Sequence, residues 1–342
     1  MVNPDSNLYR EHSDWILATV GREPLQHRNQ HVLDLSNPAV WHYLVERIDQ
    51  ILSQHAVDYV KWDHNRDLLE AGSASHEGAP AVHSQNAAFY ALLDELRARH
   101  PHVTWESCAG GGGRIDLGVV ERVQRFWTSD MTDALARQRI QRWTSQLIAP
   151  EYLGAHISAP ISHQTGRALS LDFRAATAFF LAFGIEWDLT EATEAELDEL
   201  ATWVTLHKQN RPLLHSGQAV RIDVTDPAVF AHGVIAEDRD EAVLCYVQLD
   251  EAVHNRGCTL RVPGLRPDSL YQLRWLGPVD REPTSMSPGL SALGPTDGAV
   301  VTGRQLADIG MWMPRRRPQT AQLMHIIPVT ADHDGAPRIQ VS

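Results

Sequence analysis

The sequence predicts an α/β fold built on a parallel sheet, followed by a small antiparallel β domain. Three observations predict it. From about residue 30 to 210, short apolar runs alternate with amphipathic segments, which is typical of successive βα units. Four of the five apolar runs in this region end in polar residues. After about residue 212 the runs are short, often alternate apolar with polar residues, and are separated by Gly, Pro and Asp.

The first predicted element is a helix that precedes the first strand. Ser36 is expected to cap this helix, and Pro38 suits its first turn. Five βα units are then expected from the alternation of apolar runs and helical periodicity. The strands are predicted at 57–62, 102–107, 125–129, 152–158 and 183–188, and further helices at about 84–99, 134–149, 171–182 and 194–210.

The C-terminal part of the chain predicts a separate antiparallel β domain. Its short runs and closely spaced turn residues are strand and turn signals. We therefore predict two domains, a (β/α) portion at 1–212 and an antiparallel β domain at 213–342. The predicted strands lie in the segments RIDVTD, VFAHGVIAE, AVLCYVQLD, TLRVPGL, YQLRWLG and LMHIIPVT.

The composition excludes several classes of partner. The chain has 342 residues and a formal net charge of −13. Nucleic acid and anionic membrane surfaces need a cationic face, so we expect neither as a partner. No apolar run approaches the roughly 18 residues of a membrane span, and the first residues lack the features of a signal peptide. These features predict a cytoplasmic protein that binds a small neutral molecule.

We expect no metal and no cofactor. The three cysteines lack paired or CxxC spacing, and the 18 histidines include no HExxH motif. The glycine run at 109–114 lacks the spacing of a phosphate loop, and we interpret it as a segment whose backbone either approaches a ligand closely or forms a tight turn. Cys108 is expected to be a packed residue or part of a pocket wall rather than a nucleophile.

The polar ends of the strands predict a catalytic site. The segments KWDHN, WESCAGGGGR, WTSDMTD and EWDL end four of the strands. In a parallel α/β barrel the carboxyl ends of all strands face one rim, so residues from distant segments meet there. Asp63 and Asp130 are the best-placed pair of carboxylates, and such a pair is what glycoside hydrolysis requires.

Two simpler interpretations of these residues remain open at this stage. An Asp that follows a strand often caps the next helix. Lys61 precedes Asp63 by two residues, so both side chains lie on one face of the strand, and the lysine would favour the ionised, nucleophilic form of the carboxylate. The same two residues could instead form a plain surface ion pair.

Five segments resemble successive motifs of one enzyme family, the bacterial α-galactosidases of glycoside hydrolase family 36. The resemblance covers essentially the whole of residues 1–212, and the motifs stand in the order and at the spacing of the family. It implies a retaining enzyme with a (β/α)8 TIM-barrel domain and a C-terminal β-sandwich. The motifs are RNQHVLDLSNP, YVKWDHNRD, WESCAGGGGRIDLG, WTSDMTD and GAHISAPISHQTGR.

The resemblance assigns roles to residues that occupy matching positions. It implies that Asp63 is the nucleophile and Asp130 the acid/base, acting on terminal α-galactosyl residues of galactosides such as melibiose or raffinose. The remaining matched residues are expected to bind the sugar, with the last two at the pocket wall near its C2 hydroxyl: Arg28, Lys61, Asn65, Cys108 and Gly110.

The resemblance also implies that the barrel is incomplete. Family members have an N-terminal β-sandwich and three barrel strands before the point that corresponds to Met1. Five strands cannot close an eight-stranded barrel, so we expect an open sheet edge and an open apolar inner surface. The alternatives are an inactive remnant, or a transglycosidase or α-N-acetylgalactosaminidase of the same family. A homo-oligomer is possible in each case.

Overall fold

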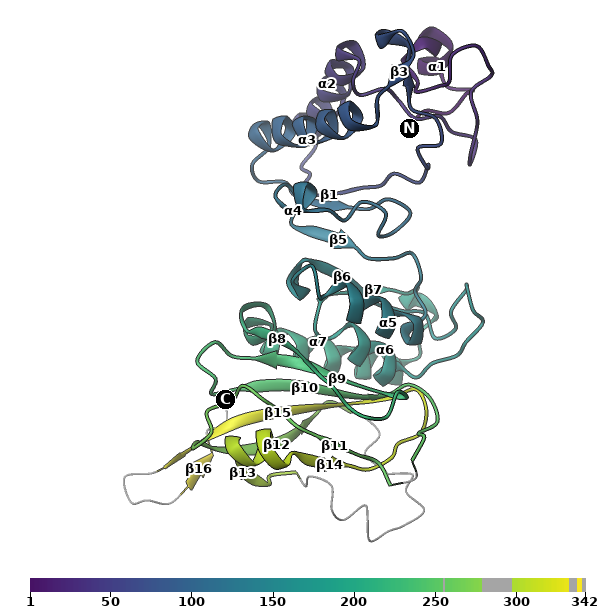
Figure 1. The fold of residues 1–342 in the computed structure, drawn as a ribbon. Coiled ribbons are helices and arrows are strands. Elements are labelled where there is room, and N and C mark those ends of the chain that lie inside the picture. Colours follow the sequence, from purple (N-terminus) through teal and green to yellow (C-terminus); the bar gives the residue numbers. More distant parts are fainter. Residues whose placement is uncertain (255, 279–296, 332–336, 340–342) are drawn as a thin grey trace. The chain divides into compact units, whose positions relative to one another are not determined.

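The computed structural model describes residues 1–254, 256–278, 297–331 and 337–339 (Figure 1). The chain forms two compact units, Met1–Asp130 and Met131–Ser342, and each is described in turn.

The first unit contains three parallel strands in the order β1-β4-β5. Helices separate these strands in the sequence, as the βα pattern predicts. The short strands β2 and β3 form a separate hairpin. The main elements of the unit are α1 (Asn7–Glu11), α2 (Pro38–Gln54), β1 (Tyr59–Trp62), β2 (Gly72–Ser73), β3 (Ala79–Pro80), α3 (Val82–Arg99), β4 (Thr104–Ser107), α4 (Leu117–Val120) and β5 (Arg125–Trp127).

One face of these strands packs against α3. Side chains alternate along a strand, so Trp62 points away from the face that carries Lys61. The Trp62 ring lies 5.7 Å from that of Phe89 on α3 and 5.9 Å from that of Trp105 on β4. The helix buries the apolar positions that its periodicity predicts, Phe89, Leu92, Leu93 and Leu96. The opposite face of the strands is left for polar groups.

The start of α2 differs from the sequence prediction. Asn37, not Ser36, caps the helix, and its side-chain oxygen accepts a hydrogen bond from the Ala39 N–H at 3.0 Å. Ser36 instead donates its hydroxyl to the Asp34 carboxylate, which also accepts from the Ser36 N–H. Because a charged acceptor two residues earlier binds Ser36, the neighbouring amide takes the cap position.

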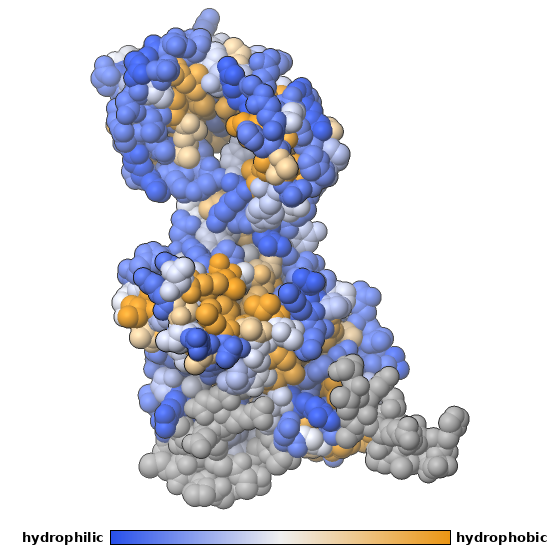
Figure 2. Space-filling model, turned by 180° about the vertical axis from the view of Figure 1, so that it is seen from behind, coloured by the Kyte–Doolittle hydropathy of each residue, from blue (hydrophilic) through white to orange (hydrophobic). Residues whose placement is uncertain are grey.

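The sheet of the first unit has an open edge, as predicted. Among the described residues, β1 pairs with β4 and lies at the end of the strand order. The run at 31–35 before it forms isolated bridges only. The unit also has a cavity of 360 Å³, whose lining includes Val32, Leu35 and Leu44. Figure 2 shows hydrophobic residues in a hollow of this unit.

The second unit begins with two further parallel strands and their helices. The strands β6 and β7 pair in parallel over five residues. Thr193 and Glu196 form a capping box that fixes the start of α7, which continues through Pro212 beyond the predicted end at 210. The elements are α5 (Ala134–Thr144), β6 (Leu153–Ser158), α6 (Leu171–Ala178), β7 (Ala182–Glu186) and α7 (Glu194–Ser216).

The rest of the second unit is an antiparallel β domain. Its main sheet has the order β13-β12-β15-β10-β9-β8, with β16 paired to β15, and β11 pairs with β14. One apolar cluster includes buried residues of the main sheet and of the β11–β14 pair, as expected for a sandwich core. The strands are β8 (Gln218–Ile222), β9 (Val229–Ile235), β10 (Ala242–Gln248), β11 (Cys258–Leu260), β12 (Leu270–Leu276), β13 (Val300–Thr302), β14 (Met311–Met313), β15 (Thr320–Ala331) and β16 (Pro337–Ile339).

The change from α/β to antiparallel structure falls at Gly217, between α7 and β8. The α/β part of the second unit contacts the β domain, because α6 packs against β15. None of the helices described here is both long enough and apolar enough to cross a bilayer.

Candidate active site

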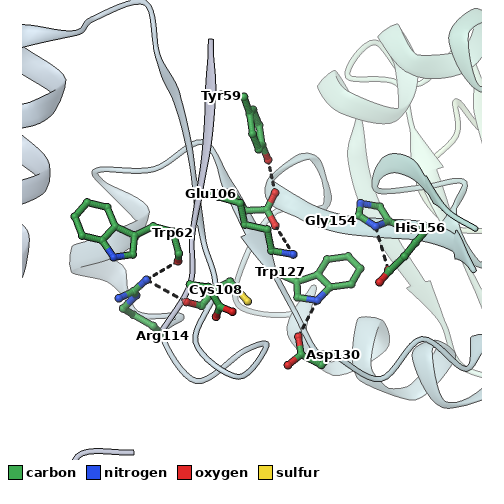
Figure 3. A network of polar contacts seen from close by, with 12 residues as sticks. Tyr59, Trp62, Glu106, Cys108, Arg114, Trp127, Asp130, Gly154 and His156 are labelled. Carbon is green, nitrogen blue, oxygen red and sulfur yellow. Dashed lines mark hydrogen bonds and ion pairs between the residues drawn. The ribbon is translucent and has the colours of Figure 1, made fainter. Parts of the chain in front are cut away.

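The site lies where β1, β4 and β5 of the first unit end. Each of the three strands leads into a polar segment, and the face opposite α3 carries alternate residues of each strand. On β1 these are Tyr59 and Lys61, with Asp63 next in the same alternation. Glu106 on β4 and Trp127 on β5 contact Lys61 on this face. Figure 3 shows several of these groups together.

Asp63 is exposed and held by its immediate neighbours. Its Oδ1 accepts a hydrogen bond from the His64 N–H at 2.8 Å, and its Oδ2 accepts one from the Asn65 side-chain amide. The Asn65 Oδ1 in turn accepts from the Gly110 N–H at 3.0 Å. Asn65 therefore links the Asp63 carboxylate to the glycine loop that follows β4.

The glycine loop lies directly against the backbone that carries Asp130. Gly111 has a φ of +82°, a conformation that glycine adopts readily. A Cβ atom there would lie 2.6 Å from the Ser129 Cα and 2.7 Å from the Asp130 N. At Gly112 it would lie 2.5 Å from the Thr128 O. The glycines are thus needed for a close approach to the segment that follows β5, a packing role that the interpretation from sequence, which named a ligand or a tight turn, did not include.

Asp130 is oriented by the last residue of β5, the strand that precedes it. Its Oδ1 accepts a hydrogen bond from the Trp127 indole N–H at 3.1 Å (Figure 3). Through Asn65 and the glycine loop, the segments of Asp63 and Asp130 meet at one rim of the three strands. The arrangement therefore places the chain segments of the two carboxylates named from sequence at the same end of the strands.

Cys108 forms part of the wall beside Asp63. Only 2% of the residue is exposed, and its N–H donates to the Trp62 carbonyl at 3.0 Å. Burial, assisted by a hydrogen bond to Asp63, raises the pKa of the Cys108 thiol to about 11. The thiol is therefore protonated near neutral pH, which fits the predicted wall role and not that of a nucleophile.

Arg114 is a structural residue of the site that the sequence reasoning missed. Its guanidinium donates to the Trp62 carbonyl at 2.7 Å and to the Cys108 carbonyl at 3.1 Å (Figure 3). It also lies over the Phe89 ring, 4.2 Å from the centroid, and burial lowers its pKa to about 10. Arg114 thus ties the ends of β1 and β4 together. The one sequence signal was a basic residue that closes the glycine run.

The ion pair of Lys61 differs from the expected one. The sequence pointed to Asp63, but the ammonium pairs with Glu106, its register partner on β4, at 3.5 Å. The Lys61 Nζ also lies 4.5 Å from the centroid of the Trp127 ring. Glu106 was not singled out from sequence, because a cross-strand partner depends on register, which a single strand does not reveal.

Arg28 occupies a separate turn. Arg28 and Asn29 both have a φ of +56° and stand at the tip of a turn closed by hydrogen bonds between His27 and Gln30. Among the described residues, no hydrogen bond or ion pair joins Arg28 to Asp63. The Arg66 Nε, however, donates to the Gln30 carbonyl at 3.1 Å. The turn is therefore anchored to the segment that follows Asp63.

A polar network in the second unit holds the segment directly after Asp130. The Thr132 hydroxyl donates to the Gln164 side chain at 2.9 Å. Asp133 caps α5 and forms an ion pair with Arg167. Gln164 and Arg167 belong to the GAHISAPISHQTGR motif, so that motif holds the first residues of the second unit.

Comparison with known proteins identifies the family of both parts of the chain. Residues 1–217 match the Melibiase family, and residues 229–326 match the glycosyl hydrolase family 36 C-terminal domain. The chain is 44% identical over 274 residues to an alpha-galactosidase of Escherichia coli, a match that covers 80% of this chain and 38% of that protein. The chain thus spans about two fifths of the length of this curated relative.

Solved structures show the same fold. A variant of the family 36 alpha-galactosidase AgaA from Geobacillus stearothermophilus, in complex with raffinose, matches with a TM-score of 0.85 and 32% identity, over 96% of this chain and 43% of that one. The alpha-galactosidase from Lactobacillus brevis matches with a TM-score of 0.83 and 30% identity, over 97% and 44%. The fold is the predicted TIM-type barrel in incomplete form with a C-terminal β domain, and the chain belongs to glycoside hydrolase family 36.

Proposed function

We propose that the chain carries the catalytic face of an α-galactosidase that hydrolyses terminal α-galactosyl residues with retention of configuration. Family membership supports the reaction, and the polar rim of β1, β4 and β5 supports the site. The observation that carries the proposal is the link from Asp63 through Asn65 to the glycine loop that lies against Asp130. It supports the proposal because a retaining mechanism needs two carboxylates at one rim, and this link connects the segments that carry them.

Asp63 acts as the nucleophile in this proposal. The His64 N–H and the Asn65 amide hold its two oxygens, which fixes the plane of the carboxylate while it stays exposed to a substrate. In the first step an oxygen of Asp63 bonds to the anomeric carbon as the bond to the leaving oxygen breaks. The product is a covalent galactosyl-enzyme.

Asp130 acts as the acid and then as the base. Its proton passes to the leaving oxygen in the first step, and it takes a proton from the attacking water in the second. The Trp127 indole N–H holds one of its oxygens at 3.1 Å. We expect the carboxyl groups of Asp63 and Asp130 to be about 5–5.5 Å apart, the separation of retaining glycosidases.

Five residues complete the proposed sugar site. Lys61 supplies charge and a hydrogen-bond donor below the two carboxylates, and Asn65 orients Asp63. Cys108 and Gly110 form the wall near the C2 hydroxyl, where the small side chains leave room for plain galactose. Arg28 reaches the sugar from its turn, which Arg66 anchors.

The substrate class follows from the relatives. Solved structures of AgaA variants contain raffinose and stachyose, and we extend this class to the present chain, with melibiose as its smallest member. We also propose a cytoplasmic location, because Cys108, Cys245 and Cys258 are all unpaired thiols and a reducing compartment keeps them so.

Azide rescue tests the roles of the two carboxylates. Asp63→Ala and Asp130→Ala should each abolish most hydrolysis of an aryl α-galactoside with a good leaving group. Azide should then give β-galactosyl azide with the Asp63 variant, because azide attacks from the vacated nucleophile side. With the Asp130 variant it should give the α-azide, because the galactosyl-enzyme still forms.

Asp67→Ala is the matched control, since Asp67 is an exposed carboxylate of the same motif with no proposed role. The same azide anomer from both variants would refute the assignment. The first sugar formed by the unaltered chain should be the α-anomer, and the β-anomer would refute retention.

The alternative is that this chain is a remnant without turnover. Among the described strands β1 pairs with β4 alone. This favours the inactive alternative, because barrel enzymes take their substrate contacts from many strands. It predicts no hydrolysis above the Asp63→Ala level. Slow turnover with galactosyl transfer to sugar acceptors would favour a transglycosidase, and a preference for the N-acetylated sugar would favour an α-N-acetylgalactosaminidase.

A further inference from the structure

Glu106 is a buried carboxylate beneath the proposed catalytic pair. It lies on β4, in register with Lys61 of β1 and with Arg125 of β5, and only 5% of the residue is exposed. A carboxylate that is removed from water is costly unless it is paired and hydrogen-bonded. Its partners therefore indicate why the chain places it there.

The two Glu106 oxygens have different partners on one neighbouring strand. The Lys61 ammonium lies 3.5 Å from Oε1, and the Tyr59 hydroxyl donates to Oε2. Burial, together with the nearby Glu106, raises the pKa of Tyr59, so the phenol keeps the proton that it donates. Two residues of the same face of β1 thus hold the carboxylate in a fixed orientation (Figure 3).

Trp127 connects this pair to the catalytic rim. The Lys61 Nζ lies 4.5 Å from the centroid of the Trp127 ring, and the Trp127 indole N–H donates a hydrogen bond to Asp130. Asp63 follows Lys61 by two residues, so the two side chains lie on the same face of the chain at the end of β1. The ammonium therefore has two carboxylates on its own face of the sheet, Glu106, with which it pairs, and Asp63, the next residue of the alternation.

We propose that Glu106 is a positioning residue that holds the Lys61 ammonium on the Trp127 ring and keeps it from pairing with Asp63. A lysine has a flexible four-carbon stem, so its ammonium follows the nearest fixed anion. With Glu106 charged, Lys61 stays below the rim with its remaining donors directed to a ligand. The significance for sugar binding rests on the proposed function, but the position of Lys61 does not.

The position of Lys61 can be measured without turnover. Lys61 and Lys208 are the two lysines of the chain, and Lys208 is exposed. Reductive ¹³C-methylation keeps the charge and labels both lysines and the N-terminal amine, and the variants Lys208→Arg and Lys61→Met assign the signals. The Lys61 methyl signal should lie upfield of the Lys208 signal, because the indole ring current shields groups above its face.

Three variants test the cause of that shift. In Glu106→Gln the upfield shift should be lost, because the amide keeps the hydrogen bond from Tyr59 but has no charge for Lys61. Glu121→Gln is the matched control, since Glu121 is a strongly exposed glutamate of the same unit, and it should leave the signal unchanged. An unchanged Lys61 signal in Glu106→Gln, or an unshifted one in the parent chain, would overturn the proposal.

If Glu106→Gln does not fold, Glu106→Asp decides the question. It keeps the charge but draws it back by one methylene, so the Lys61 signal should move while that of Lys208 stays. No movement in a folded Glu106→Asp chain would overturn the proposal.

A kinetic cycle separates positioning from a general structural role. A displacement of about 1 Å can cost about 100-fold in rate, so Glu106→Gln should lower kcat/KM by about 10- to 100-fold. In a Lys61→Met background the same change should have little further effect, because Glu106 acts through Lys61. Effects that multiply in the double variant would contradict this. If the chain has no turnover, the proposed function fails while the methyl signal still decides the position of Lys61.

Discussion

Replacement of Gly111 by alanine should destabilise the chain more than the positive φ of this residue alone would explain. An added Cβ would lie 2.6 Å from the Ser129 Cα and 2.7 Å from the Asp130 N, both closer than non-bonded carbon and nitrogen atoms approach. These atoms are backbone, so no side chain can rotate away. Either the glycine loop or the end of β5 must move by several tenths of an ångström.

The magnitude has two parts. Alanine at the φ of +82° costs about 1–2 kcal/mol because its Cβ disfavours the left-handed region. The overlap adds about 1–3 kcal/mol, the usual range for overpacking a tight site. Gly21→Ala is the matched control, because Gly21 has the same φ of +82° and open space around its Cβ position. The difference between the two variants therefore isolates the contact with Ser129 and Asp130.

Urea denaturation of both variants measures this difference, and hydrolysis of an aryl α-galactoside measures its effect on the site. Gly111→Ala should unfold at least about 1 kcal/mol more easily than Gly21→Ala. Its activity should fall by up to about 100-fold, because the segment that carries Asp130 is displaced. Equal stability of the two variants would refute the close approach of the glycine loop to β5.

Three further predictions concern stability and association. The buried His207 ring stacks on the Phe183 ring, with 4.6 Å between the ring centroids, and burial lowers the His207 pKa from 6.5 to about 4. Between pH 6.5 and 4 the unfolded chain therefore binds more protons at this residue than the folded chain does. The free energy of unfolding should therefore fall as the pH drops from about 6.5 to 4, by at most about 3 kcal/mol for this group, and urea titrations should show a shallower loss in His207→Asn. Arg114→Met should lower the free energy of unfolding by about 1–3 kcal/mol for each backbone carbonyl that loses its hydrogen bond. Arg122 is partly exposed, so the control Arg122→Met should lower it by about 1 kcal/mol or less, and equal losses in the two variants would contradict the role of Arg114 in joining β1 to β4. The open edge of β1 should make the purified chain associate, and a monomer at all concentrations in light scattering would contradict that expectation.

Periodicity predicted much of the fold because it reports which side of an element is buried. It placed Phe89 and Leu92 in the interior and separated Trp62 from Lys61. Contacts between different elements could not be predicted in this way. Glu106 pairs with Lys61 only through the register of β1 and β4, and no spacing within one strand encodes that register.

Competition between neighbouring side chains for the same cap position was also not predictable from the sequence. Ser36 and Asn37 are both good helix caps, and the choice between them depends on Asp34, which takes the serine hydroxyl. Arg114 was missed for a similar reason, since its two acceptors are backbone carbonyls that have no signature in the sequence.

The contacts at the rim indicate how much of a barrel the proposed catalytic geometry requires. Asp63 is held by the next two residues, Asp130 is held by a tryptophan three residues earlier, and one loop of the intervening strand relates the two. Adjacent βα units are therefore sufficient to orient both carboxylates. In barrel enzymes the ends of several strands contribute to the active site, and substrate contacts that strengthen in the transition state lower the barrier. We therefore expect that joining this chain to a polypeptide that carries further barrel strands raises kcat/KM without moving Asp63 relative to Asn65.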